Sequence, residues 1–240
     1  MGLGFRSLLL AAAVSFAGLY GAGSGLACGT GGYTYAGIAA PSHAYGISAT
    51  ITPVSAFSVV SGHVAGWVGV GGPKQGPGGT DEWLQVGFSG FPTAAGSSLY
   101  YELTLPSQAP SYHEIATGLP AGKAQHVAVL EIAGRHDWWR VWVNDKPVSA
   151  PIHLPSSHGR WAPIATAESW DGGSGGSCNG FLYRFNAVSI ASAPGGSWHP
   201  LVGGYPITSP TTRLARGRSG PSFLAAEGAD ALRTLSTVNS

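Results

Sequence analysis

Three polar side chains interrupt apolar stretches of strand length, and carboxylates held in this way are candidates for hydrolytic chemistry. Glu168 lies near the end of residues 164–170 (IATAESW), just before a Gly-rich segment. Gln85 lies within residues 82–87 (EWLQVG), and Glu102 follows two tyrosines. The structural alternatives are that Glu168 faces solvent and that Gln85 is a buried amide whose hydrogen bonds the fold satisfies.

Other familiar catalytic sites are missing from the sequence. The loop at residues 71–79 lacks the Gly-Lys-Ser/Thr ending of a phosphate loop and precedes a strand instead of a helix. The eight His residues stand at no zinc-binding spacing such as His-Glu-x-x-His. No Gly-x-Ser-x-Gly elbow followed by a helix marks a serine hydrolase. We therefore expect neither a metal nor another cofactor, and carboxylate chemistry is the enzymatic option that remains.

Four short motifs, taken in order, resemble those of the glutamic endopeptidases, or eqolisins. They are residues 64–72 (VAGWVGVGG), 83–87 (WLQVG), 100–102 (YYE) and 167–168 (AE). The resemblance extends over roughly residues 61–190. It implies a secreted two-sheet sandwich of concanavalin-A-like form and, as the function, acid endopeptidase activity on a polypeptide substrate.

The resemblance also implies roles for particular residues. Glu168 matches the catalytic Glu of the Ala-Glu strand and would be the general base that activates a water. Gln85 matches the Gln of the Leu-Gln-x-Gly strand and would hold that water and stabilise the oxyanion. Trp67 would pack along the bound substrate, and Glu102 would hold Gln85 in place without contacting the substrate itself.

The sequence departs from the family pattern close to these motifs. Gly71 stands where the family's Trp-x-Gly-x-Asp-Gly segment has Asp. Ser169 follows the catalytic Glu in place of Trp, and Trp170 comes one position later. The connection at residues 73–80 is also longer and richer in Gly and Pro than the family's. These differences leave open a sandwich that retains Gln85 and Glu168 without catalysis.

An aromatic cluster supports an alternative function. Strand alternation places Trp138, Arg140 and Trp142 on one face, and Trp139 and Val141 on the other. We expect one of these faces to lie in the core and the other to line a groove. Aromatic rings with an Arg could stack on sugars or hold an extended peptide. The alternative is therefore a non-catalytic secreted sandwich that binds a cell-surface glycan or cell-wall polymer; Arg140 could equally be an ordinary surface charge.

Glycoside hydrolysis is a third option. A retaining glycosidase needs two carboxyl groups about 5–5.5 Å apart, so Glu168 would need Glu102 or Glu131 as its partner. The spacing in residues 168–171 (ESWD) does not match the Glu-x-Asp-x-Glu strand of laminarinase-like sandwiches. Whichever group lies beside Glu168 decides among the three functions.

The remaining sequence describes the elements that position these residues. Strand-length apolar segments alternate with turns rich in Gly, Pro, Ser and Asp, and no amphipathic helix stands among them. The 38 Gly and 17 Pro disfavour long helices. About ten strands without an amphipathic helix predict an all-β fold, an antiparallel two-sheet β-sandwich of the concanavalin-A-like jelly-roll type. The expected strands are Ile47–Val54, Ser61–Val70, Glu82–Phe88, Leu99–Leu105, His126–Ile132, Trp138–Val143, Ile164–Trp170 and Phe181–Ile190, with weaker ones at Tyr112–Ala116 and Val148–His153.

Both ends of the chain differ from this body. Residues 1–27, with Arg6 before an apolar run and small residues after it, predict a secretory signal peptide. Residues 28–204 form the expected sandwich domain. Residues 205–240 are expected to be a flexible tail, with one possible short helix at Phe223–Leu235. We therefore expect an extracellular protein, with no integral membrane span in the mature chain and a monomeric state.

The two cysteines bear on how the N-terminus of the mature protein is held, and the net charge bears on whether nucleic acid is a partner. Cys28 and Cys178 are the two cysteines of the chain, and a secreted protein permits a disulfide between them. Cys28 at the end of the leader also allows a lipid anchor instead. Nucleic-acid binders carry a concentrated basic face, and a formal net charge of +1 gives no case for nucleic acid as a partner.

Overall fold

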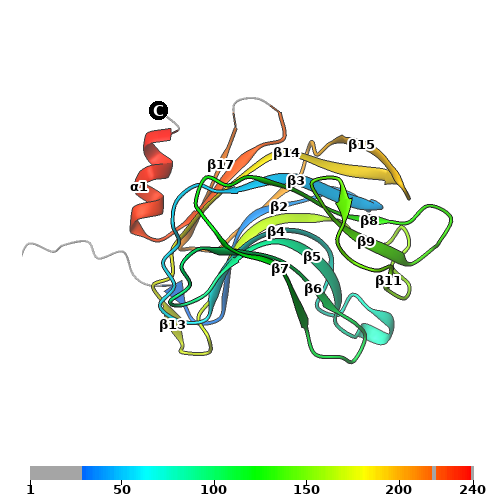
Figure 1. Cartoon of the computed structure of the whole chain (residues 1–240), viewed down its shortest axis with the longest axis horizontal. Coiled ribbons are helices and arrows are strands. Elements are labelled where there is room, and N and C mark those ends of the chain that lie inside the picture. The colour runs from blue at the N-terminus through cyan, green and yellow to red at the C-terminus, as the bar shows by residue number, and fades with distance from the viewer. Residues whose placement is uncertain (1–28, 218–219, 239–240) are drawn as a thin grey trace, which may run out of the picture.

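Two antiparallel sheets pack face to face in the computed structural model, which describes residues 29–217 and 220–238 (Figure 1). The expected β-sandwich is therefore confirmed. The expected signal peptide at residues 1–27 lies outside the described residues. Cys28 lies outside them too, and with it both the lipid anchor and the Cys28–Cys178 disulfide. β1 (Gly29–Thr30) pairs with β13 (Gly176–Ser177), and Gly29 is opposite Ser177.

The seven-stranded sheet carries the residues singled out by the motifs. Its strands, in spatial order, are β16 (Tyr205–Thr208), β2 (Tyr33–Ala39), β12 (Ile164–Trp170), β4 (His63–Gly72), β5 (Glu82–Gly90), β6 (Ser97–Thr104) and β7 (Ser111–Leu119). A short 3-10 turn, η1 (Pro77–Gly79), lies in the connection between β4 and β5. The sheet therefore places β12, β4 and β5 side by side at its centre.

The nine-stranded sheet forms the second layer. Its order is β10 (Lys146–Pro147), β9 (Trp138–Val143), β8 (Gln125–Glu131), β3 (Gly46–Pro53), β14 (Phe181–Ala193), β18 (Phe223–Glu227) and β17 (Thr212–Arg216), with β11 (Ile152–His153) on β9 and β15 (Gly196–Pro200) on β14. The turn between β9 and β10 has Asn144 and Asp145 at φ of 47° and 63°. Asn and Asp tolerate this left-handed conformation, which suits a tight hairpin turn.

The main core lies between the sheets and follows strand alternation. Val68, Leu84 and Val86 of one sheet and Val129 and Trp139 of the other are fully buried. In β9 the buried positions alternate with partly exposed ones along the whole strand. One face of each sheet is thus used for the core, and the other face points away from it.

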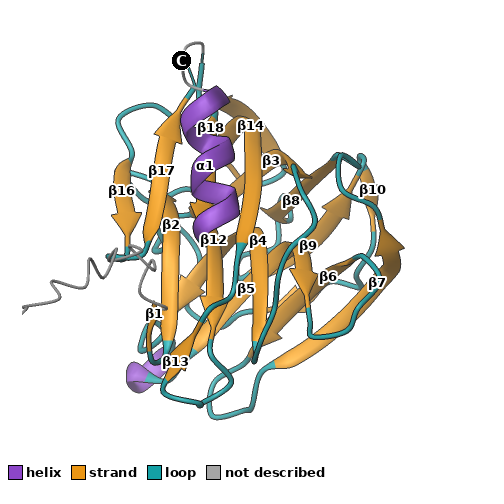
Figure 2. Cartoon of the chain, turned by 90° about the vertical axis from the view of Figure 1, so that its left-hand side faces the viewer, coloured by secondary structure: helices purple, strands orange, loops and turns teal. Residues whose placement is uncertain are grey.

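The segment from residue 205 onward differs from the expected flexible tail. Its described part adds β16 to the first sheet and β17 and β18 to the second, and ends in α1 (Ala229–Val238). Every residue of β18 is buried, because the core lies on one side and α1 covers the other through Leu235 and its neighbours (Figure 2). Residues 223–235, expected as one helix, therefore divide into a strand and a helix at Gly228, where φ is 87°.

No helix within residues 29–217 and 220–238 is long and apolar enough to cross a membrane.

Glu82 makes the stability of the fold depend on pH. Its side chain is fully buried, and within the described structure neither carboxylate oxygen has a hydrogen-bond partner. Burial, and secondarily the charge of Asp137, raises the pKa of Glu82 from 4.5 to about 7. The folded state therefore holds a proton that the unfolded state releases, so stability falls as pH rises through this interval.

We expect Glu82→Gln to remove that part of the pH dependence. Chemical unfolding of the parent protein at pH 4.5 and pH 7 should show a loss of free energy of unfolding that is larger than the variant's. The expected difference is about 2–3 kcal/mol, because each pKa unit corresponds to 1.36 kcal/mol. Equal pH dependence of the two proteins would contradict the assignment. The comparison does not depend on the absolute cost of placing an amide at this position.

Candidate functional site

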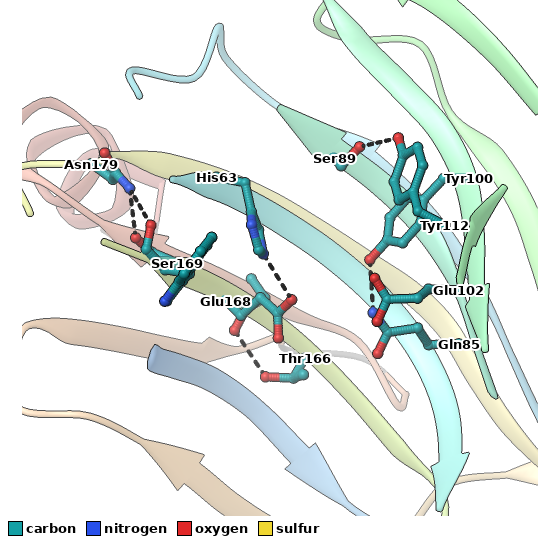
Figure 3. A network of polar contacts seen from close by, with 12 residues as sticks. His63, Gln85, Ser89, Tyr100, Glu102, Tyr112, Thr166, Glu168, Ser169 and Asn179 are labelled. Atoms are coloured by element: carbon teal, nitrogen blue, oxygen red, sulfur yellow. Dashed lines mark hydrogen bonds and ion pairs between the residues drawn. The ribbon is translucent and has the colours of Figure 1, made fainter. Parts of the chain in front are cut away.

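Glu168 and Gln85 lie on the same face of the seven-stranded sheet, the face directed away from the core. Glu168 of β12 is opposite Ala65 of β4, and Gln85 of β5 is opposite Gly69 of β4. Ala65 and Gly69 are an even number of residues apart, so both positions belong to one face. The two candidate catalytic side chains therefore flank β4, one from each side (Figure 3).

Small residues and Trp67 make up the surface between them. Trp67 occupies the position of β4 between Ala65 and Gly69, opposite Gly87 of β5. A Cβ atom added to Gly87 would lie 2.1 Å from the carbonyl oxygen of Gly66, and one added to Gly69 would lie 2.9 Å from the Cβ of Gln85. Glycine at these two positions thus allows Trp67 and Gln85 to sit where they do.

Glu168 is almost completely buried and contacts a histidine. Glu168 is 6% exposed, and its Oε1 lies 3.5 Å from Nε2 of His63, the first residue of β4. Burial, and then the charges of Glu168 and Glu102, raises the pKa of Tyr33 to about 12. Burial followed by Glu168 likewise raises the pKa of Tyr35. The tyrosines beside Glu168 therefore stay protonated and add no charge to the site at acid or neutral pH.

Gln85 is held by hydrogen bonding from the neighbouring strand. Its Nε2 donates to the hydroxyl oxygen of Tyr100 of β6 at 3.0 Å. Tyr100 stacks on Tyr112 of β7, with ring centroids 4.9 Å apart, and the Tyr112 hydroxyl lies 2.9 Å from Oγ of Ser89 (Figure 3). These contacts fix the direction of the amide on the sheet. A side-chain amide carries two N–H donors, so one remains for another acceptor.

Glu102 lies directly opposite Gln85 in the sheet. Its Oε1 accepts a hydrogen bond from Nε1 of Trp83 at 3.1 Å. Burial raises the pKa of Glu102, and Glu168 adds to the rise, while the Trp83 hydrogen bond and His63 oppose it. The expected place of Glu102 beside Gln85 agrees with this geometry, but the direct hydrogen bond to the Gln85 amide comes from Tyr100.

Asn179 ties the end of β12 to the segment that leads into β4. Its Nδ2 donates to Oγ of Ser169 at 3.1 Å and to the carbonyl oxygen of Ser61 at 2.8 Å. Its Oδ1 accepts from the backbone N–H of Val60 at 2.8 Å. The side chain is buried, so these bonds replace hydration that it has lost. Asn179 thereby fixes the relative placement of the two segments that carry Glu168 and His63.

The aromatic cluster of β9 lies on the opposite side of the sandwich from Glu168. Trp139 of β9 is buried in the main core, so Trp138, Arg140 and Trp142 face outward from the nine-stranded sheet. The ring of Trp138 already has two neighbours, His153 with its centroid at 5.0 Å and the Arg135 guanidinium at 4.2 Å. The binding residues expected from the sequence thus fall into two groups. Trp67 and Glu102 share the face of Glu168, whereas Trp138, Arg140 and Trp142 lie on the other sheet.

Three residues of this site, His63, Tyr100 and Asn179, are not among those predicted from the sequence. The first two had a visible signal, because alternation from Trp67 reaches His63 and alternation from Glu102 reaches Tyr100. Asn179 had none, since its partners are distant in the sequence. Glu131, considered as a partner for Glu168, lies in the other sheet and pairs with Nδ1 of His158 at 2.9 Å.

Metal ligands do not converge in the described part of the chain. Within residues 29–217 and 220–238, no three His, Cys, Asp or Glu side chains are grouped so that they could hold a metal ion. The candidate site is therefore built from a carboxylate, an amide and an imidazole, with aromatic side chains around them.

Comparison with solved structures identifies the architecture. Scytalido-glutamic peptidase in complex with a transition-state analogue inhibitor has a TM-score of 0.56 and 17% sequence identity, covering 84% of this chain and all of the other, 100%. The same peptidase with a peptide-based transition-state analogue has a TM-score of 0.55, 15% identity and coverage of 83% and 98%. The chain has the eqolisin fold.

A further member of that family supports the same conclusion. SCP-B, an eqolisin in complex with the tripeptide Ala-Ile-His, has a TM-score of 0.51 and 16% identity, covering 83% of this chain and 98% of the other. No protein-family profile matches the sequence. No curated protein matches it significantly either. The likeness to the eqolisins is thus a likeness of fold.

Proposed function

We propose that this protein is an eqolisin-like acid endopeptidase in which Glu168 and Gln85 form the catalytic pair. The observation that carries the proposal is the placement of Glu168 and Gln85 on one face of the sheet, on either side of β4. The fold and the order of the motifs agree with it. Two of the solved eqolisin structures hold transition-state analogues and the third holds a tripeptide, so this architecture can accept peptide ligands.

The chemistry assigns one function to each side chain. The ionised carboxylate of Glu168 removes a proton from a water molecule, and the hydroxide attacks the carbonyl carbon of the scissile peptide bond. The carbonyl oxygen becomes an oxyanion, which accepts a hydrogen bond from the remaining N–H of the Gln85 amide. Glu168, now protonated, gives that proton to the leaving nitrogen as the carbon–nitrogen bond breaks. The products are a new carboxylic acid and a new amine, and Glu168 returns to its ionised form.

Operation in acid is consistent with the rest of the molecule. A carboxylate base remains ionised at pH values where a neutral His or Lys base would be protonated. The raised pKa of Glu82 means that acid favours the folded state at that position. The catalytic group and the stability of the fold therefore both suit an acidic medium.

The test is digestion of a denatured protein substrate from strong acid to neutral pH. The chain is produced with residues 1–27 and recovered after export, and N-terminal sequencing reports where this segment is removed, which also tests secretion. Mass spectrometry of the digest should show new peptide termini that appear in acid and disappear toward neutral pH. A folded protein that cleaves no peptide bond at any pH would contradict the proposal. Release of reducing sugar from polysaccharides would instead assign Glu168 and Glu102 to glycoside hydrolysis.

Glycan binding by the β9 face gains no comparable support. Stacking on a sugar needs a free aromatic face. Trp138 is contacted by both Arg135 and His153, and within the described residues the buried indole nitrogen of Trp142 has no hydrogen-bond partner. The ring of Trp138 is therefore already in contact with two side chains, and the peptidase site remains the better-supported proposal.

A further inference from the structure

His63 is the residue whose imidazole lies within ion-pair distance of the Glu168 carboxylate. It begins β4 opposite Trp170, two positions from Ala65, so its side chain shares the face of Glu168. Its Nε2 lies 3.5 Å from Oε1 of Glu168, and Figure 3 shows the imidazole directed at that carboxylate. The His63 side chain is 21% exposed, so the contact is largely shielded from solvent while the imidazole can still exchange protons with water.

We propose that His63 is a positioning residue of the Glu168–Gln85 site: its imidazolium form holds the Glu168 carboxylate ionised and in place, and so extends activity into stronger acid. This inference rests on the proposed peptidase function. It adds to that function a charged partner for the general base, which neither the amide of Gln85 nor the tyrosines can supply.

Three aromatic rings pack around His63. Its ring centroid lies 6.0 Å from that of Tyr33, 6.0 Å from that of Phe91 and 5.6 Å from that of Trp170. The planes of these rings are inclined to the imidazole by 65°, 57° and 51°. The three rings therefore restrict where the imidazole can move and keep it close to Glu168.

The other titratable groups around His63 do not replace it. Tyr33 and Tyr35 of β2 and Tyr100 of β6 all have a raised pKa and remain neutral in acid. Glu102 of β6 and Glu168 of β12 are the acidic groups that face His63 across the sheet, and His63 lowers the pKa of Glu102 against the larger effect of burial. Among these described groups, His63 is thus the side chain that can carry a positive charge beside Glu168.

The consequence is a defined shift in the pH profile. An imidazolium at His63 and a carboxylate at Glu168 each favour the charged form of the other at this separation. Without the positive charge, Glu168 takes up a proton at a higher pH and the general base is lost earlier on acidification. The acid limb of kcat/KM should then move toward neutral pH by about one pH unit, which is the lower end of the effect of a close opposite charge.

The experiment compares the pH profiles of four variants with the parent. His63→Gln removes the charge, and His63→Phe removes it while keeping an aromatic ring among Tyr33, Phe91 and Trp170. His63→Lys keeps a positive charge. His126→Gln is the matched control, because His126 of β8 also lies close to a carboxylate, 3.3 Å from Oδ1 of Asp145, but in the other sheet.

The expected result separates charge from packing. Both neutral variants should show the displaced acid limb, while the Lys variant and the His126 control should keep the parent's limb. A loss of activity in the neutral variants with no change in the shape of the profile would overturn the inference and leave His63 as a packing residue. A parent protein without activity would remove the peptidase proposal and this inference together, whereas an active parent with unmoved variants would remove this inference alone.

Discussion

Glu168→Gln is expected to abolish peptidase activity while leaving the protein folded. The neutral amide has nearly the same shape as the carboxylate but cannot accept a proton from water. General acid–base catalysis by one positioned group contributes about 10²–10⁴-fold, and this residue acts first as base and then as acid. We therefore expect kcat/KM at the acid optimum to fall by about 10³–10⁴-fold, measured on a peptide taken from the mapped cleavage sites.

The matched control is Glu114→Gln. Glu114 of β7 lies opposite Tyr100 in the same sheet, and its exposed carboxylate accepts a hydrogen bond from Oγ of Ser98 at 3.0 Å. The same chemical change at this edge position should leave kcat/KM and the pH optimum unchanged. If Glu168→Gln retained the parent's activity, Glu168 would be a structural carboxylate and the general base would have to be sought elsewhere.

The Glu168→Gln variant is expected to keep its fold. Glu168 is buried, and its ion-pair contact is with a partly exposed His63. The amide can still occupy the same space, so thermal unfolding of Glu168→Gln should remain cooperative. A variant that lost both structure and activity would not distinguish catalysis from stability, and Glu168→Asp then serves in its place. That variant keeps the charge but withdraws it from the substrate by one methylene group, so activity should fall although the carboxylate remains.

Several strands of both sheets could be predicted well from the sequence, because each is a regular apolar stretch between turns. The expected bounds of Ile164–Trp170 and Trp138–Val143 are those of β12 and β9. β2 was missed although its residues 33–39 (YTYAGIA) alternate, because Gly37 and the small alanines weaken the signal. The described residues after Gly204 were predicted to be a flexible tail because their apolar stretches are short. These stretches become buried only when other strands and α1 cover them.

The site itself was predictable only up to its main pair. Alternation assigns side chains to the two faces of one strand. It does not show to which of the two sheets that strand belongs, nor which of its faces points away from the core. For this reason the sequence could assign Trp138 and Trp142 to one face of their strand as possible binding residues, but it could not show that this strand belongs to the other layer from Glu168. The contact of His63 with Glu168 depends on the register between β4 and β12, which no local sequence pattern encodes.

Gln85→Ala is expected to lower kcat by about 10²–10³-fold with little change in KM, because the loss of one oxyanion donor typically costs that much. The amide N–H is aimed at charge that develops only in the transition state, so removing it should affect the rate more than substrate binding. Steady-state kinetics at the acid optimum measures both constants. A large rise in KM with unchanged kcat would contradict the oxyanion role and make Gln85 a substrate-binding residue.

Tyr100→Phe provides the graded control for that variant. It keeps the ring that stacks on Tyr112 and removes the hydroxyl that accepts the Gln85 hydrogen bond at 3.0 Å. The amide remains but is less well directed, so the loss should be smaller, about 10-fold. The double variant Gln85→Ala/Glu168→Gln should be hardly slower than Glu168→Gln alone, because residues that act in one step are not additive. Full additivity of the two losses would instead mean that Gln85 and Glu168 act independently, and the shared face on either side of β4 would not be a catalytic pair.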